Sequence, residues 1–178
     1  MIGTILKSRY HIISLLKVGG NGETFIAEDL HIPGLVKSRY LVKRLRPDIM
    51  DDETQRLFHQ EAQILHDLSK EHEQLPKVIA YFQEKDDFYL IQDWIVGHDL
   101  RQEFKPGKQC QESYIIKLLY DVLTVLSFVH QKRVIHRDIK PRNIMRRQGD
   151  DKLFLIDFGT VKQVKQQTML RTNTINSN

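Results

Sequence analysis

The chain lacks the features that mark secreted, membrane-spanning and zinc-binding proteins. Its 178 residues include one cysteine, Cys110, which excludes an intrachain disulfide and a four-cysteine zinc site. No stretch approaches the roughly 20 consecutive apolar residues that cross a bilayer, and the start lacks the apolar core of a secretion signal. The eight histidines show no zinc-ligand spacing together with a third ligand. We therefore expect a cytoplasmic protein without a membrane segment.

A strong charge of one sign is also missing. The formal net charge is +4, from 27 Lys and Arg against 23 Asp and Glu, and the basic residues are scattered among acidic ones. This balance argues against a nucleic-acid partner. Hydrophobic residues make up 40% of the chain, which is enough for one domain with its own core, divisible into two lobes.

Short apolar, β-prone runs dominate the first 94 residues. Gly19-Gly20-Asn21-Gly22 forms a glycine-rich bend between the first two runs, and a polar turn at 83–87 joins the last two. These patterns predict a small antiparallel sheet of five strands, at 10–17, 24–27, 40–45, 78–82 and 88–92.

Two stretches have helical periodicity. The acids at 51–53 are typical of a helix start, and apolar residues recur after them at steps of three and four up to Leu68. The stretch 113–129 carries the strongest helical pattern of the chain, with an apolar stripe wide enough to need neighbours on more than one side. We expect short strands at 134–135 and 153–156, and a mobile polar tail at 163–178 that contains Thr168, Thr172, Thr174 and Ser177.

Lys43 and Glu61 are predicted to form an ion pair. Alternation along 41–45 places Lys43 on the same face as Leu41 and Leu45, and Glu61 lies on the inward stripe of the first helix. An exposed lysine would be the ordinary outcome on a strand. Burying an unpaired carboxylate costs free energy, and pairing Lys43 with Glu61 offsets this cost for both side chains.

The segment His136-Arg137-Asp138-Ile139-Lys140-Pro141-Arg142-Asn143 is followed by Asp157-Phe158-Gly159. With the glycine-rich bend, the strand lysine and the helix glutamate in that order, these motifs resemble the signature set of protein kinases. The closest resemblance is to the bacterial eukaryotic-like serine/threonine kinases, whose domains often open with a similar Ile-Gly-x-x-Leu-x-x-Arg-Tyr stretch. It covers essentially the whole chain, which corresponds to the N-terminal part of the kinase domain and ends in the activation segment.

The resemblance implies ATP and Mg²⁺ as cofactors and phosphorylation of a protein substrate on serine or threonine. Asp138 would orient the acceptor hydroxyl and Lys140 would neutralise the γ-phosphate, a spacing typical of serine/threonine rather than tyrosine kinases. Asn143 and Asp157 would be the metal ligands. His136 would support the loop, and Arg137 would await a phosphate on the activation segment.

The nucleotide would lie under the glycine loop and along the hinge. Lys43 would contact the α- and β-phosphates and Glu61 would align it. Lys17 stands where the family usually has its first glycine, and Asn21 stands where an aromatic residue often lies. The further residues implied are Val18, Gly19, Gly20 and Gly22 in the loop, the hinge residues Asp93 and Ile95, Gln92 as gatekeeper, and Asp99 near the ribose.

The implied fold is α+β and protein-kinase-like. A five-stranded antiparallel N-lobe with one helix would span 1–94, and 95–178 would hold the hinge, the start of a mainly helical C-lobe, the catalytic loop and the start of the activation segment. The helices that follow in the family are absent, so a partner chain or dimer could cover the exposed face. Two alternatives remain: a non-catalytic nucleotide-binding or decoy module that pairs with another kinase, and a remnant that does not fold cooperatively.

Overall fold

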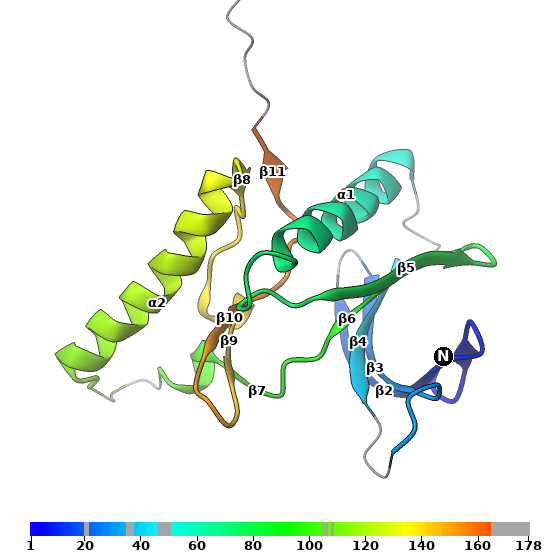
Figure 1. Cartoon of the computed structure of the whole chain (residues 1–178), viewed down its shortest axis with the longest axis horizontal. Helices are drawn as coiled ribbons and strands as arrows, with labels where there is room; N and C mark the ends of the chain where they lie inside the picture. The colour runs from blue at the N-terminus through cyan, green and yellow to red at the C-terminus, as the bar shows by residue number, and fades with distance from the viewer. Residues whose placement is uncertain (20–21, 35–37, 46–50, 105–106, 108, 165–178) are drawn as a thin grey trace, which may run out of the picture.

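A computed structural model shows two groups of elements (Figure 1). Residues of both groups line a cleft. The structure describes residues 1–19, 22–34, 38–45, 51–104, 107 and 109–164. The predicted loop residues Gly20 and Asn21 and the tail threonines therefore lie outside the described residues.

A six-stranded antiparallel sheet forms the first group, in the order β1-β2-β3-β4-β6-β5. The predicted count of five strands is corrected by β1, a two-residue edge strand that pairs with the start of β2 and is too short to show alternation. The other five strands are those predicted from the sequence. Four are longer than predicted, and the one predicted at 40–45 is shifted by one residue toward the N-terminus. The strands are β1 (Ile5–Leu6), β2 (Tyr10–Gly19), β3 (Gly22–Asp29), β4 (Arg39–Arg44), β5 (Val78–Glu84) and β6 (Asp87–Asp93).

Helix α1 (Asp52–Ser69) lies along this sheet and begins at the predicted acids. The carboxylate of Asp51 accepts a hydrogen bond from the backbone N–H of Thr54 at 2.7 Å, which is an N-cap. Its buried face includes Phe58, Glu61 and Leu65, so the glutamate does lie on the inward stripe.

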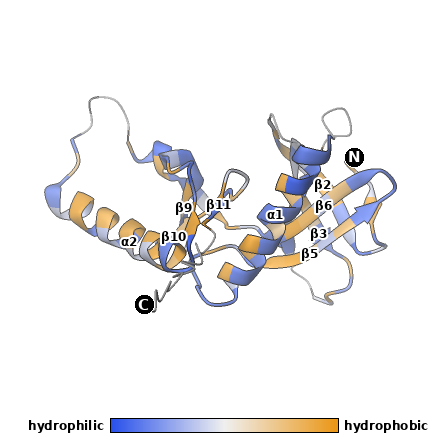
Figure 2. Ribbon diagram, turned by 90° about the horizontal axis from the view of Figure 1, so that it is seen from above, coloured by the Kyte–Doolittle hydropathy of each residue, from blue (hydrophilic) through white to orange (hydrophobic). Residues whose placement is uncertain are grey.

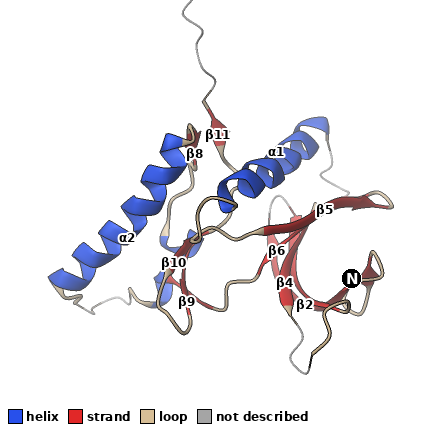
Figure 3. Ribbon diagram, viewed as in Figure 1, coloured by secondary structure: helices blue, strands red, loops and turns tan. Residues whose placement is uncertain are grey.

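The second group contains α2 (Glu112–Gln131) and short strands, which Figure 3 distinguishes by colour. Two of these strands were predicted, β8 (Val134–Ile135) and β10 (Leu153–Leu155), and three were missed. The missed strands are β7 (Gly97–Asp99), β9 (Ile144–Arg147) and β11 (Lys162–Gln163). Because β11 pairs with β8, the predicted mobile tail does not begin at Gln163.

The main core joins the two groups. Leu65 and Leu68 of α1, Val129 of α2 and Leu155 of β10 belong to one buried cluster, and Phe158 lies within it with no exposed surface. A separate cluster that includes Ile12, Val42 and Ile91 fills the sheet. The segment around Phe158 is therefore anchored between the two helices, next to the cleft.

One face of α2 is exposed. Its side chains Ile116, Leu119, Tyr120 and Leu123 each expose more than half of their surface, and Figure 2 shows hydrophobic segments recurring along the helix. By length and composition, α2 is the one described helix that could cross a membrane. Length and composition are weak evidence for a membrane span, because the core helix of a globular lobe meets the same criterion. Helix α2 also packs against β8 and β10. The absence of a membrane segment stays a prediction.

Candidate active site

A cleft of about 370 Å³ lies where the sheet, α1 and the loops after β8 and β10 meet. Small-molecule sites usually have 300–1,000 Å³, so the cleft is large enough for a ligand. Seven predicted site residues line it together: Gly19, Gly22, Lys43, Glu61, Asp138, Lys140 and Asp157. The lining also includes Lys17 and Gly159, which belong to the predicted motifs, and five residues that the sequence did not indicate: Glu23, Thr24, Arg44, Phe58 and Thr160.

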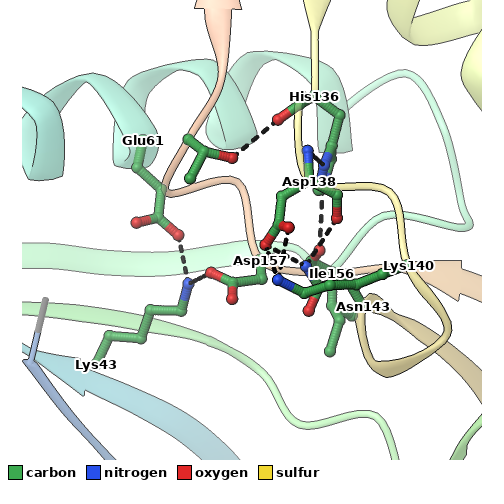
Figure 4. A network of polar contacts seen from close by, with 9 residues as sticks. Lys43, Glu61, His136, Asp138, Lys140, Asn143, Ile156 and Asp157 are labelled. Atoms are coloured by element: carbon green, nitrogen blue, oxygen red, sulfur yellow. Dashed lines mark hydrogen bonds and ion pairs between the residues drawn. The ribbon is translucent and has the colours of Figure 1, made fainter. Parts of the chain in front are cut away.

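Lys43 connects three elements across the cleft (Figure 4). Its ammonium on β4 donates to the Glu61 carboxylate on α1, as predicted, and to Asp157 Oδ1 at 3.0 Å. Burial alone would lower the pKa of Lys43, but the charges of Glu61 and Asp157 raise it above its ordinary value. The charge of Lys43 lowers the pKa of Asp157 against the effect of burial. Both groups are therefore charged at neutral pH.

The hairpin of β9 and β10 places Asn143 and Asp157 at the same end. Leu155 is paired with Ile144, so the residue before β9 and the residues after β10 are neighbours. The backbone N–H of Ile156 donates to the carbonyl of Asn143 at 2.9 Å. Asp157 has a positive φ of 66°, which turns its carboxylate toward Lys43. The strand register thus brings together Asn143 and Asp157, which lie on either side of the β9–β10 hairpin in the sequence.

The loop after β8 holds Asp138 through short-range contacts. Lys140 donates to both carboxylate oxygens, at 2.5 Å to Oδ1, and Asn143 Nδ2 donates to Oδ2 at 2.8 Å and to the backbone carbonyl at 2.9 Å. Pro141 begins the short 3₁₀ turn Pro141–Asn143 that sets this spacing. The hydrogen bond from Lys140 lowers the pKa of Asp138, so its carboxylate is ionised at neutral pH.

The buried ring of His136 supports the loop that holds Asp138. Its Nε2 lies 3.1 Å from the carbonyl of Ile156, and its Nδ1 accepts from the backbone N–H of Asp138 at 3.3 Å. This pattern requires the neutral ring with the proton on Nε2. The ring contacts Phe158 edge-on, with centroids 4.8 Å apart, and burial lowers the pKa of His136. His136 thus links the loop of Asp138 to the segment of Asp157.

Two glycines of the cleft lie close to neighbouring groups. A Cβ on Gly22, where φ is +146°, would lie 2.2 Å from the carbonyl oxygen of Arg44, so no other residue fits. A Cβ on Gly159 would lie 3.2 Å from Glu61 Oε2 and would press on the ion pair with Lys43.

Several predicted residues lie outside the cleft lining, including the predicted metal ligand Asn143, which is buried. Val18 exposes 54% of its surface, and Asp93 is fixed by Lys77, whose backbone N–H donates to Asp93 Oδ2 at 3.1 Å. Ile95 is buried, and its backbone N–H and carbonyl make no hydrogen bond with any residue that the structure describes. Gln92 is also buried, and its Oε1 has no partner within the same part of the chain.

Two further residues have local partners. Asp99 accepts from Arg101, including its backbone N–H at 3.0 Å. Arg137 donates to the carbonyl of Thr160 at 2.6 Å, on the segment that follows Gly159. The side chains predicted to face a ribose and a phosphate therefore already contact protein groups in this structure.

No group of three or more His, Cys, Asp or Glu side chains in the described ranges could hold a metal ion by itself. Asn143 and Asp157 nevertheless fit a hard cation. The Asn143 amide nitrogen faces Asp138, which leaves its oxygen available, and Lys43 occupies only Oδ1 of Asp157. Two oxygen donors suit Mg²⁺, which is usually bound by one or two protein ligands together with phosphate oxygens and water.

Comparison with known proteins gives one family. A family profile described as "Protein kinase domain" matches residues 15–178. Serine/threonine-protein kinases C and B of Synechocystis sp. are 44% and 42% identical to the chain, over 89% and 95% of its length. Serine/threonine-protein kinase PknA of Nostoc sp. is 43% identical over 89%. The chain covers 30%, 29% and 28% of these three relatives, which is less than a third of each.

Proposed function

The chain belongs to the protein kinase family, and from that premise we propose that it binds ATP with Mg²⁺ and transfers the γ-phosphoryl group to serine or threonine hydroxyls of proteins. The observation that carries the proposal is the convergence of Lys43, Glu61 and Asp157 on one face of the cleft, with Asp138 and Lys140 lining the same cleft. We also propose the division into lobes at 1–94 and 95–178.

The sheet side of the cleft binds and orients the nucleotide. Lys43 is held by Glu61, so its ammonium approaches the α- and β-phosphates from a fixed position. Gly19 and Gly22 let the backbone of the loop approach the phosphates without a side chain in the way. The role of Gly20 in the same loop is proposed from the sequence alone.

The loop side carries the chemistry. The ionised Asp138 accepts a hydrogen bond from the substrate hydroxyl and orients its oxygen toward the γ-phosphorus. Lys140, which contacts Asp138 in this structure, turns its charge to the γ-phosphoryl oxygens as negative charge is redistributed. Asn143 and Asp157 would hold Mg²⁺, which would supply positive charge to the phosphate oxygens.

The hinge supplies the adenine contacts in this proposal. The free N–H of buried Ile95 is available to the base edge, because an unpaired buried backbone group is costly until a ligand satisfies it. Asp93 would contribute its backbone carbonyl, because its backbone N–H donates to the carbonyl of Lys77 and its carboxylate accepts from the N–H of Lys77. Buried Gln92 stands behind this position as gatekeeper.

The test combines transfer and binding on the same purified chain. Incubation with γ-labelled ATP, Mg²⁺ and a generic serine- and threonine-containing acceptor should label the acceptor. Asp138→Asn should reduce transfer by about a thousandfold and leave ATP affinity within about twofold, because the carboxylate acts on the hydroxyl rather than on the nucleotide. Asp150→Asn is the matched control: Asp150 is a comparably exposed carboxylate paired with Arg147, and its loss should leave transfer unchanged.

The alternative function is a nucleotide-binding module without transfer, which pairs with another kinase. The exposed apolar face of α2 favours it, since such a face is suited to a partner chain. ATP binding with no label transfer would select this alternative. The absence of both binding and transfer would contradict the proposed function. A cytoplasmic location is part of the proposal in either case.

A further inference from the structure

Lys17 stands in the same cross-strand row as Lys43. In the register of the sheet, Lys17 of β2 is opposite Thr24 of β3, and Thr24 is opposite Lys43 of β4. Directly opposite residues of antiparallel strands project from the same face. Lys17 and Lys43 therefore share one face of the sheet, two strands apart, at about 4.8 Å per strand. All three residues of this row line the cleft.

The backbone at Lys17 does not need glycine. Its φ is not positive, and the residue is paired within the β2–β3 ladder, so a side chain fits without strain. Gly22 differs, because any Cβ there would meet the carbonyl of Arg44. The Lys17 side chain extends along the strand, and its Cε lies 3.8 Å from the point that a Cβ would occupy on Gly19. The lysine thus lies beside the glycine loop rather than distorting it.

The ammonium of Lys17 makes no hydrogen bond or ion pair with any residue that the structure describes. The neighbouring cations of the cleft differ in this respect, since Lys43 contacts Glu61 and Asp157, and Arg44 contacts Glu23 and Asp87. Lys17 is nevertheless near enough to Asp157 for its charge to contribute to the lowered pKa of that carboxyl. An unpaired cation that lines a cleft is available to an anionic ligand.

We infer that Lys17 binds the phosphate chain of the nucleotide, as a second sheet lysine beside Lys43. The inference rests on the proposed function, because it requires a nucleoside triphosphate in this cleft. An ammonium group is a compact charge suited to phosphate oxygens. Its attraction grows with the charge of the ligand, so affinity depends on Lys17 most for ATP, less for ADP and least for AMP. Charge from a side chain thus supplements the backbone contacts of the remaining glycines.

Calorimetric titration of the purified chain with ATP, ADP and AMP in the presence of Mg²⁺ tests the inference. Lys17→Met keeps the length of the side chain and removes its charge. We expect it to weaken ATP binding about five- to tenfold, ADP binding less, and AMP binding hardly at all. The wild-type preference for ATP over AMP should decrease as salt is added, and the variant should show a shallower dependence. Lys17→Arg keeps the charge and should stay within about threefold of wild type.

Lys17→Gly separates this inference from the opposite explanation. If the lysine only hindered close cover of the phosphates, restoring glycine would tighten ATP binding; the inference predicts that it weakens it, as Lys17→Met does. Lys117→Met is the matched control, because Lys117 is an exposed lysine on α2, outside the cleft lining. It should leave all three affinities unchanged. Thermal melting should show that every variant is folded, since Lys17 is exposed.

Three outcomes are informative. A selective loss of ATP affinity in Lys17→Met and Lys17→Gly, with retention in Lys17→Arg, supports the inference. Wild-type binding that neither Lys17→Met nor Lys17→Gly weakens overturns it and leaves the proposed function intact. Wild-type protein that binds neither ATP nor ADP overturns both.

Discussion

The two sides of the cleft hold their charged groups in different ways. On the sheet side, the Lys43 and Glu61 side chains expose 16% and 6% of their surface, and they come from a strand and a helix. On the loop side, Asp138 and Lys140 expose 29% and 38% and are two residues apart in one loop. The first arrangement exists only when β4 and α1 have packed together. The second is a local contact within one loop.

In the proposed function, this difference corresponds to a division between nucleotide binding and phosphoryl transfer. A buried ion pair between two elements fixes the position of a cation but makes the fold depend on it, because either partner alone is an uncompensated buried charge. An exposed pair contributes little to stability and can exchange partners when a substrate arrives. The sheet side is therefore suited to holding a nucleotide, and the loop side to rearranging charge during a reaction.

The largest loss of stability is expected from a substitution at Lys43. Lys43→Met leaves the buried Glu61 without its cation and should lower the free energy of unfolding by about 3 kcal/mol, besides weakening ATP binding. Urea denaturation, followed through the midpoint at constant slope, measures the loss. Adding Glu61→Gln to Lys43→Met should recover part of it, because the orphaned charge is removed.

Lys70→Met is the control for this prediction. Lys70 pairs with Asp67 three residues earlier on α1, and both side chains are more than half exposed, so the pair should contribute almost nothing. If Lys43→Met were no more destabilising than Lys70→Met, the sheet-side pair would have no structural role.

A smaller effect is expected from the glycine loop, also on the sheet side. Gly22→Ala forces a Cβ against the carbonyl of Arg44 at a positive φ and should cost about 1–3 kcal/mol of stability, with weaker ATP binding as the loop shifts. Gly149→Ala is the matched control, because Gly149 has a φ of +106° and no atom within 4 Å of the added Cβ. Its cost should be limited to about 1 kcal/mol of backbone strain. Equal losses in both variants would show that the contact with Arg44 is relieved without cost.

Sequence patterns predicted the long elements because each carries its own periodicity. Helix α1 was predicted from acids at 51–53 and apolar steps up to Leu68, and it spans Asp52–Ser69. Strands of two to four residues have too few positions to alternate. Short apolar runs still indicated β8 and β10, but β1, β7, β9 and β11 were missed. They form where distant segments happen to pair, as when Gly97 of β7 lies opposite Arg147 of β9.

Within the site, the sequence predicted pairs that burial makes necessary. Glu61 lies on an inward helical face and needs a cation, and the alternation along 41–45 indicated Lys43 as that cation. The position of Lys17 could not be obtained in that way. Strand β2 has irregularities in its register between Ile12 and Ser14 and between Leu15 and Lys17, and each changes the alternation. Only the pairing with Thr24 shows which face Lys17 occupies.

The smallest effect is expected at His136, which contacts the loop of Asp138 and packs against Phe158. Its pKa is lowered in the folded chain from an ordinary value of 6.5, so the folded state binds fewer protons than the unfolded state as the pH falls. The stabilising contribution is therefore complete above pH 6.5 and is lost as the pH decreases through 6.5 toward the lower folded value.

The measurement is the free energy of unfolding between pH 5.5 and 7.5, for wild type and His136→Asn. The carboxyls of Asp138 and Asp157 and the ammonium of Lys43 surround the ring, but the pKa values of both carboxyls are lowered below 3.8 and that of Lys43 is raised, so none titrates in this window. His136→Asn should flatten the pH dependence whatever its effect on overall stability. His72→Asn is needed as a control, because burial also lowers the pKa of His72. The coupling is expected because the neutral Nδ1 of His136 is the acceptor for the backbone N–H of Asp138. If only His72→Asn removed the slope, protonation of His136 would not affect the stability of the loop side.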